Sequence, residues 1–323
     1  MRAIVGTRYG IPDILPLRDW PAPAVPAGGV LVRVHAAALN ALDWYLYSGH
    51  LAPVRLVFGL TRPGRPIPGV DFAGTVEAVG PHASRFRVGD AIFGVAPGTL
   101  AEFVAVREDK AAPIPAGVSF EQAAALPVAG STALQGLRDF GRVEPGQRVL
   151  VNGAAGGVGS FAIQVARVLG AEVTAVCGVA HLEQARALGA SHVVDYARED
   201  ITLSERRFDL VFDVAGGHGW KEFRRVLEPG GRLVLAGGPR TRWYGPLGHV
   251  LAMHVASRGE RRRLASFIAK ITPADLSTLA ELVAAGVLRP VVDRFPMTEA
   301  ADAFRALGGG HCRGKNVLYW LQT

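Results

Sequence analysis

The sequence predicts an α/β protein of two lobes, a β-barrel-like lobe followed by a doubly wound parallel sheet. The chain has 323 residues, and a single hydrophobic core rarely grows beyond about 250 residues before a chain divides. Residues 1 to about 120 contain short strands broken by glycine and proline, whereas residues 148–238 alternate apolar strands with helical stretches. With 49% hydrophobic and 20% charged residues, the composition is that of a globular protein.

The first lobe is predicted from four short segments in which apolar and polar residues tend to alternate. These are residues 30–34, 74–79, 91–95 and 101–106. Such alternation is typical of antiparallel strands with one buried face. The pattern changes at Ser119, an expected helix N-cap that is followed by Glu121, Gln122 and further helix-forming residues, until Pro127 interrupts them. We therefore expect one domain of residues 1–122, completed by residues 264–323, and a second domain of residues 123–263.

The second lobe is predicted from the alternation of strands and helices. Strands are expected at residues 149–151, 173–176, 193–194, 210–214 and 233–236, and helices at residues 158–169, 182–188 and 220–227. This alternation requires right-handed crossovers and hence a Rossmann-type parallel sheet. Beyond a loop at 237–248 we expect helical segments at 249–270 and 273–285, a strand at 291–292, a helix at 299–307 and a strand at 316–320. That last strand could return to the first lobe.

The net charge of +7 is distributed in a way that argues against nucleic acid as a partner. Many arginines stand beside acidic residues, which favours solvated faces. Only residues 258–263 are densely basic, and there an exposed helix start or an oligomer rim is favoured over a nucleic-acid site. No signal-peptide pattern and no membrane-length apolar run is present, so we expect a cytoplasmic protein without a membrane partner. The two cysteines, Cys177 and Cys312, give no basis for a disulfide framework or a cysteine-rich metal site.

Residues 149–159 carry the strongest functional signal. They read Val-Leu-Val-Asn-Gly-Ala-Ala-Gly-Gly-Val-Gly, which predicts a strand, a glycine turn and a helix start. Such a turn lets the backbone approach a pyrophosphate, whose negative charge is favoured at a helix N-terminus. Ala154 occupies the first glycine position of the dinucleotide fingerprint when Gly156 and Gly159 take the other two. The expected cofactor contacts in this turn are Ala155, Gly156, Gly157 and Val158.

The end of the second parallel strand bears on the choice between NADPH and NADH. Enzymes that use NADH usually place an aspartate or glutamate there to bind the ribose 2′-hydroxyl. Here the strand at 173–176 is followed by Cys-Gly-Val-Ala-His, so no carboxylate repels a 2′-phosphate and NADPH is favoured. No arginine or lysine of this loop attracts the phosphate either. Gly178 and His181 are candidate contacts, with a solvent-exposed helix-start histidine as the alternative for His181.

Several motifs are spread along nearly the whole chain. They are Asn-Ala-Leu-Asp-Trp at 40–44, Pro-Gly-Val-Asp-Phe-Ala-Gly at 68–74, Val-Gly-Asp at 88–90, Ala-Leu-Pro at 125–127, the glycine turn, Leu-Gly-Ala at 188–190, Asp-Tyr at 195–196 and Arg-Gly-Lys at 313–315. Together they resemble the quinone oxidoreductase branch of the medium-chain dehydrogenase/reductase superfamily. The resemblance implies a GroES-like first lobe. In zinc alcohol dehydrogenases of the superfamily a cysteine stands where Asn40 is and Gly-His-Glu where residues 69–71 are, so no metal is expected here.

The resemblance also implies roles for individual residues. Asn40 is expected to be catalytic, lining the substrate cleft near the nicotinamide, with turn formation as the alternative. Tyr47 and Tyr45 are possible proton donors, with packing as the alternative. The further cofactor contacts implied are Thr132, Tyr196, Gly237, Gly238 and Lys315.

These expectations lead to a specific reaction. Hydride transfer to an unactivated ketone needs a Lewis acid, whereas a quinone or an enone delocalises the incoming charge onto its own oxygen. We therefore expect a zinc-independent, NADPH-dependent reduction of quinones or α,β-unsaturated carbonyls. The alternatives are an enoyl-thioester reductase and a cofactor-binding protein with little turnover. The stretch from 243 to 255 is rich in apolar residues and predicts a homodimer; these residues are Trp243, Tyr244, Leu247, Val250, Leu251 and Met253.

Overall fold

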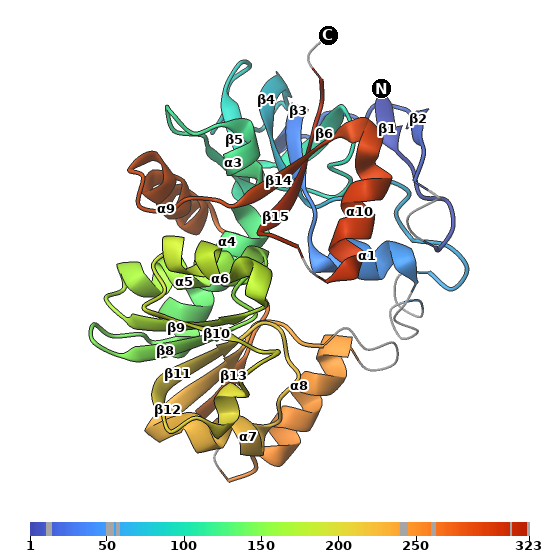
Figure 1. Cartoon of the computed structure of the whole chain (residues 1–323). Helices are drawn as coiled ribbons and strands as arrows, with labels where there is room; N and C mark the ends of the chain where they lie inside the picture. Colours follow the sequence, from blue (N-terminus) through green and yellow to red (C-terminus); the bar gives the residue numbers. More distant parts are fainter. Residues whose placement is uncertain are drawn as a thin grey trace. The chain divides into compact units, whose positions relative to one another are not determined.

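A computed structural model describes residues 1–10, 15–49, 55, 59–239, 245–259, 263–310 and 312–321 of the chain (Figure 1). The chain forms two compact units. Unit 1 comprises Met1–Ser131, Lys270–Gly286 and Pro290–Thr323, and unit 2 comprises Thr132–Ala269 and Val287–Arg289. Among the described residues, no helix is both long enough and apolar enough to span a membrane.

Unit 1 is built around a seven-stranded sheet in the order β14-β15-β3-β4-β5-β7, with β6 also paired to β3. Its strands are β3 (Gly29–Ala38), β4 (Asp71–Val79), β5 (Ala91–Val95), β6 (Phe103–Arg107), β7 (Ala111–Pro113), β14 (Val292–Pro296) and β15 (Lys315–Tyr319). A separate antiparallel pair is formed by β1 (Arg2–Ile4) and β2 (Leu17–Asp19). Strand β15 runs antiparallel to the end of β3, which confirms that the C-terminal strand returns to the first lobe.

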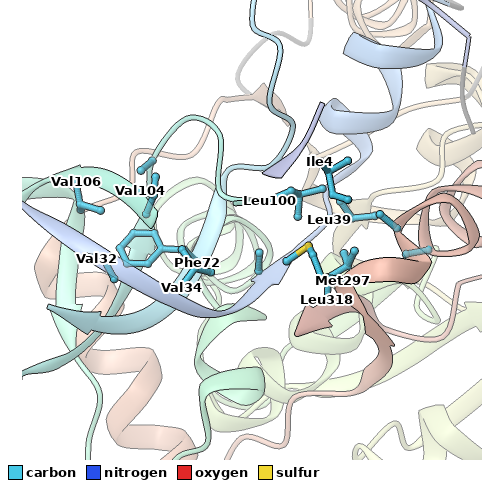
Figure 2. Close-up of a cluster of buried hydrophobic side chains, with 14 of the residues drawn as sticks. Ile4, Val32, Val34, Leu39, Phe72, Leu100, Val104, Val106, Met297 and Leu318 are labelled. Carbon is cyan, nitrogen blue, oxygen red and sulfur yellow. The ribbon is translucent and has the colours of Figure 1, made fainter. Parts of the chain in front are cut away.

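Strand β3 organises this unit because it pairs with several neighbours. Its first half pairs with β6, Ala36–Ala38 pair with β15, and β4 runs along most of its length. Side chains of β3 and its neighbours form the hydrophobic core that Figure 2 shows. Val32, Phe72 and Val104 belong to this core, and Leu318 of β15 lies beside Met297 in it. Burying a side chain of this size contributes about 1.5–3 kcal/mol. The site residues of unit 1 are therefore attached to a well-packed sheet.

Helices and short helical turns complete unit 1. They are α1 (Ala41–Ser48), α3 (Phe120–Ala124), α9 (Pro273–Ala284), α10 (Ala300–Gly309) and the 3₁₀ turns η1 (Glu108–Lys110) and η6 (Met297–Glu299). Ser119 caps α3 as predicted, since its hydroxyl accepts a hydrogen bond from the N–H of Gln122. Pro127 begins α4 (Pro127–Gln135), at a position where a helix needs no N–H donor.

Unit 2 contains a six-stranded sheet in the order β10-β9-β8-β11-β12-β13, with every neighbouring pair parallel. Its strands are β8 (Arg148–Asn152), β9 (Glu172–Cys177), β10 (His192–Asp195), β11 (Phe208–Asp213), β12 (Leu227–Leu235) and β13 (Leu264–Ser266). The longer helices are α5 (Gly157–Val168), α6 (Leu182–Ala187), α7 (Trp220–Val226) and α8 (Gly245–Ala256). The predicted doubly wound sheet is confirmed. Its chain order reverses between β8 and β11, and sheets of this kind bind ligands at the carboxyl ends of such strands.

One predicted helix is wrong in its second half. The helical pattern expected over 249–270 ends with α8 at Ala256, and Leu264–Ser266 instead form the edge strand β13 beside β12. A strand of three residues is too short to display a period of two, so the sequence holds no local signal for it. The strand is specified by pairing with β12, a tertiary contact.

Candidate functional site

The turn between β8 and α5 requires glycine at two positions. Gly153 has φ +89°, a conformation that side chains rarely adopt. A Cβ on Gly159 would lie 2.1 Å from the carbonyl oxygen of Gly153, so this helix packs directly against the turn. The positive φ of the turn thus falls on Gly153 and not on Ala154, whose N–H donates a hydrogen bond to the oxygen of Val176 at 2.9 Å. This geometry explains how alanine fits the first glycine position of the fingerprint.

The same turn leaves the start of α5 open to a ligand. Gly156 is the N-cap residue, has no side chain to cap the helix, and has open space where a Cβ would stand. The N–H groups of a first helical turn have no partner within the helix, and the helix dipole adds positive potential there. The backbone of residues 155–158, predicted to contact the cofactor, therefore offers donors to an anion such as a pyrophosphate.

Hydrogen bonds and close backbone packing join the loops that follow β8, β11 and β12 at the carboxyl edge of the sheet. Asp213 at the end of β11 is fully buried, and its Oδ1 accepts hydrogen bonds from Asn152 Nδ2 at 2.8 Å and from the N–H of Gly216 at 2.9 Å. A Cβ on Gly237 would lie 2.2 Å from the oxygen of Val214, so the loop of Gly237 and Gly238 packs closely on its neighbour. These contacts give the predicted cofactor edge a fixed shape.

Asp213 also faces a histidine that sequence analysis did not single out. Its Oδ2 lies 3.5 Å from Nε2 of His249 on α8, and both atoms are buried. Among the described residues, neither atom has a hydrogen-bond partner. No sequence signal connects the two residues, which are brought together by the packing of α8.

The residues expected around the 2′-position of the cofactor do lie together in unit 2. The N–H of His181 donates to the oxygen of Gly178 at 2.9 Å, and the N–H of Tyr196 donates to the oxygen of Cys177 at 3.3 Å. A Cβ on Gly178 would lie 3.3 Å from the hydroxyl of Tyr196, whose side chain is 58% exposed. Asp195 is turned into its own loop, where it accepts from the N–H of Ala197 at 3.0 Å. The end of β9 thus presents no carboxylate.

In unit 1, Asn40 and Lys315 meet at a buried carboxylate, Asp71. Lys315 Nζ lies 3.0 Å from Asp71 Oδ2 and 2.6 Å from Asn40 Oδ1, and Asn40 Nδ2 donates to Asp71 Oδ2 at 3.0 Å. The sheet explains the cluster: Lys315 begins β15, Asp71 begins β4, and Asn40 follows β3, the strand between them. The side chains of Lys315 and Asp71 are 4% and 0% exposed, while Asn40 is half-buried.

A second carboxylate, Asp43, lies close to this cluster. It accepts hydrogen bonds from the N–H of Asn40 at 2.8 Å and of Gly69 at 3.2 Å. Burial raises the pKa of Asp43 to about 7, against the lowering effect of the Asn40 hydrogen bond. Burial also raises the pKa of Asp71, although Lys315 and Asn40 oppose this by stabilising its charge. The cluster therefore holds negative charge that is costly to bury and is only partly neutralised.

Three of the side chains predicted for the site remain to be placed. Tyr47 is buried, its hydroxyl donates to the oxygen of Arg65 at 2.8 Å, and burial raises the pKa of this hydroxyl. Tyr45 is buried as well. Thr132 lies on α4 and is half-buried.

Comparison with known proteins places this geometry in context. A family model described as alcohol dehydrogenase GroES-like domain matches residues 26–116, and one described as zinc-binding dehydrogenase matches residues 188–318. A chloroplastic quinone-oxidoreductase homolog of Spinacia oleracea is 30% identical over 334 residues, covering 98% of each chain. A chloroplastic NADPH-dependent alkenal/one oxidoreductase of Arabidopsis thaliana is 34% identical over 337 residues, covering 99% of this chain and 79% of that protein. The structure of the quinone oxidoreductase from Coxiella burnetii has a TM-score of 0.89 and 31% identity, covering 99% of each chain.

Proposed function

This chain belongs to the medium-chain dehydrogenase/reductase superfamily, and we propose that it is a zinc-independent enzyme that uses NADPH to reduce quinones or α,β-unsaturated carbonyl compounds. The observation that carries the proposal is the turn between β8 and α5. It leaves the N-terminus of α5 uncapped and the space beside Gly156 open, which fits a dinucleotide pyrophosphate. The absence of a carboxylate beside Gly178 fits a 2′-phosphate and thus NADPH. The named activities of the two curated relatives support the same substrate class.

The residues of the chain account for the protein's part in this reaction. Bound NADPH supplies a hydride from its nicotinamide ring. The N–H groups at the start of α5 would hold the pyrophosphate of a bound dinucleotide, and the hydrogen-bonded loops after β8 and β11 would give it an edge of fixed shape. The chain thus contributes binding, orientation and hydrogen bonds, while the conjugated acceptor takes up the charge on its own oxygen.

The residues at the family's zinc position do not fit a zinc ion. Asp71 Oδ2 is already bound by the ammonium of Lys315 and the amide of Asn40, and an ammonium 3.0 Å from the carboxylate would repel a metal cation. Within the described part of the chain, no group of three or more histidine, cysteine, aspartate or glutamate residues is placed to hold a metal ion. We therefore propose that the reaction involves no metal.

The experiment that tests the function is NADPH oxidation with a panel of quinones, enones and an enoyl thioester. We expect loss of NADPH absorbance with the quinones and enones, unaffected by a chelator and without stoichiometric zinc in the purified protein. Turnover only with the thioester would favour an enoyl-thioester reductase. Tight NADPH binding without turnover of any acceptor would indicate a cofactor-binding protein instead.

We also propose that unit 2 forms the contact of a homodimer. Leu251 and Val255 on α8 are 67% and 46% exposed, and Ile268, just beyond the edge strand β13, is 92% exposed. Exposed apolar side chains near a sheet edge are typical of an interface. The expectation from the sequence is corrected in part, because Met253 is buried in the core and Val250 packs against it. Trp243 and Tyr244 lie outside the described residues.

A further inference from the structure

A pocket of about 290 Å³ lies in unit 2 at the amino edge of the parallel sheet, opposite the edge expected to bind the cofactor. Phe208, the buried first residue of β11, forms its apolar part. The polar lining comes from the starts of β8, β9 and β10 and from the loop before β11, and consists of Arg148, Glu172, Thr174, His192, Arg206 and Arg207. Parallel sheets bind ligands at their carboxyl edge, so the fold does not account for this pocket.

Strand pairing brings the polar side chains of three strands to one face of the sheet. Arg148 is the register partner of Glu172, and His192 is the register partner of Thr174. Register partners on neighbouring strands point to the same face, as do residues two apart in one strand, such as Glu172 and Thr174. The four side chains therefore stand together at the amino edge.

Thr174 is the buried polar group of this pocket. The residue is 4% exposed, and among the described residues none forms a hydrogen bond with its hydroxyl. A buried hydroxyl in a native protein is normally satisfied by a protein group, by water or by a ligand. Because Thr174 lines the pocket, its hydroxyl is available to whatever occupies that space.

Two arginines of the pocket have no acidic partner within the described part of the chain. The side chain of Arg206 forms no hydrogen bond or ion pair there, and the carboxylate of Glu205 beside it pairs with neither arginine. Arg207 uses Nη1 for the carbonyl oxygens of residues 204–206, at 2.9–3.1 Å, and so folds this loop over the pocket. Two positive charges therefore remain for an external anion.

The acidic groups near the pocket are directed to other partners. Arg148 is paired with Glu228 of β12, and Glu172 lies 3.1 Å from Nε2 of His192. The charge of Glu172 is thus shared with a neighbouring ring nitrogen, and the charge of Arg148 is offset by a carboxylate outside the lining. Arg206 and Arg207 give the pocket its excess of positive charge.

We propose that this pocket binds a phosphate dianion, as inorganic phosphate or as the phosphate of a small phosphomonoester, through Arg206, Arg207 and Thr174. A carboxylate has two oxygens in one plane and is matched by one guanidinium. A tetrahedral phosphate accepts hydrogen bonds on several sides, which suits donors that come from both β9 and the loop before β11. The volume lies just below the range of about 300–1,000 Å³ typical of drug-sized ligands, so the occupant is small. This second site does not depend on the proposed function.

The test titrates the whole chain by calorimetry with inorganic phosphate, glycerol 3-phosphate and malonate at constant ionic strength. A parallel titration contains saturating NADPH, which competes with phosphate for the start of α5 but not for the pocket. Arg206→Gln removes a charge, Arg206→Lys keeps it, and Thr174→Val removes only the hydroxyl. Arg138→Gln, which removes an exposed arginine elsewhere in unit 2, is the matched control.

We expect both phosphate compounds to bind with and without NADPH, and malonate to bind at least about tenfold more weakly. Arg206→Gln and Thr174→Val should each raise the dissociation constant for phosphate about tenfold or more, Arg206→Lys should raise it less, and Arg138→Gln should leave it unchanged. Tighter binding of glycerol 3-phosphate than of inorganic phosphate would identify a phosphomonoester as the occupant, and the reverse order would identify the free anion.

Three results would overturn the proposal. The first is phosphate binding that NADPH abolishes and Arg206→Gln leaves unchanged, because the anion would then occupy the cofactor turn. The second is malonate binding as tight as that of phosphate, and the third is no phosphate binding to the wild-type protein. Thermal melts of the unliganded variants check that each is folded, which is expected because the side chain of Arg206 forms no contact that the fold requires and valine matches threonine in shape.

Discussion

Substituting two glycines of the β8–α5 turn should separate damage to the fold from damage to the cofactor site. A Cβ on Gly159 would lie 2.1 Å from the oxygen of Gly153 and 2.7 Å from Cα of Ala154, which are backbone atoms of a tight turn. Gly159→Ala should therefore cost at least about 3 kcal/mol of stability, the upper range for an overpacked site. Gly156 has φ −76° and nothing within 4 Å of its Cβ position, so Gly156→Ala should leave stability nearly unchanged.

The effect of Gly156→Ala should appear in NADPH binding. Its methyl group would occupy the space through which the pyrophosphate reaches the start of α5. Losing one hydrogen bond to a charged group costs about 1.5–3 kcal/mol of binding free energy. The NADPH dissociation constant should therefore rise roughly 10- to 100-fold. Thermal melts and calorimetry measure the two quantities, and Gly28→Ala, also with open space around it, is the control. An unchanged NADPH affinity in folded Gly156→Ala would show that the phosphate lies elsewhere, and a wild-type melting temperature for Gly159→Ala would refute the packing argument.

Three further predictions concern cofactor choice, pH and assembly. Steady-state kinetics should show a preference for NADPH of roughly tenfold or more, and Gly178→Asp should reverse it by repelling the 2′-phosphate; a wild-type preference for NADH would be inconsistent with this reasoning. Because burial raises the pKa of Asp43 from 3.8 to about 7, the native state keeps a proton that the unfolded chain has lost between these values. The contribution of Asp43 to the free energy of unfolding should be full below about pH 4 and decline as the pH rises through 7, by up to about 4 kcal/mol. Thermal melts should therefore show a melting temperature that depends less on pH for Asp43→Asn than for wild type. Leu251→Glu should convert the proposed dimer to a monomer in light scattering, while Leu203→Glu, at another exposed position, should not; a monomeric wild type at micromolar concentration would contradict the assembly.

Local sequence patterns were sufficient to predict most of the fold. The alternation over 30–34 located β3, and the glycine turn with the apolar stretch after it located β8 and α5. Strand β3 runs on to Ala38 because Ala36–Ala38 are buried on both faces, and three alanines show no alternation that would predict this. Strand β13 was missed because it has only three residues and is specified by its pairing with β12, which leaves no local pattern in the sequence. Patterns thus predict elements with one buried face and fail where a segment is short or enclosed on both faces.

The candidate site divides in the same way. The residues of the phosphate turn are contiguous, so their spacing alone predicts a phosphate site. Asn40, Asp71 and Lys315 are separated by 31 residues at the least and 275 at the most, and only the adjacency of β15, β3 and β4 joins them. A sequence contains no local trace of such a contact. Resemblance to a family pointed to Asn40 and Lys315, but it gave no indication that the lysine is held by Asp71.

The energetics of this cluster argue that it is not present for stability. An ion pair buried as deeply as Lys315 and Asp71 must be removed from water, and the attraction between the charges often does no more than offset that cost. The raised pKa of Asp43 and of Asp71 is a sign of the same penalty. Apolar side chains of similar size would fill the space at less expense. What apolar side chains cannot do is set the direction of an amide, and the two charges do this for Asn40, so orientation is the property of the cluster that a stability argument leaves unexplained.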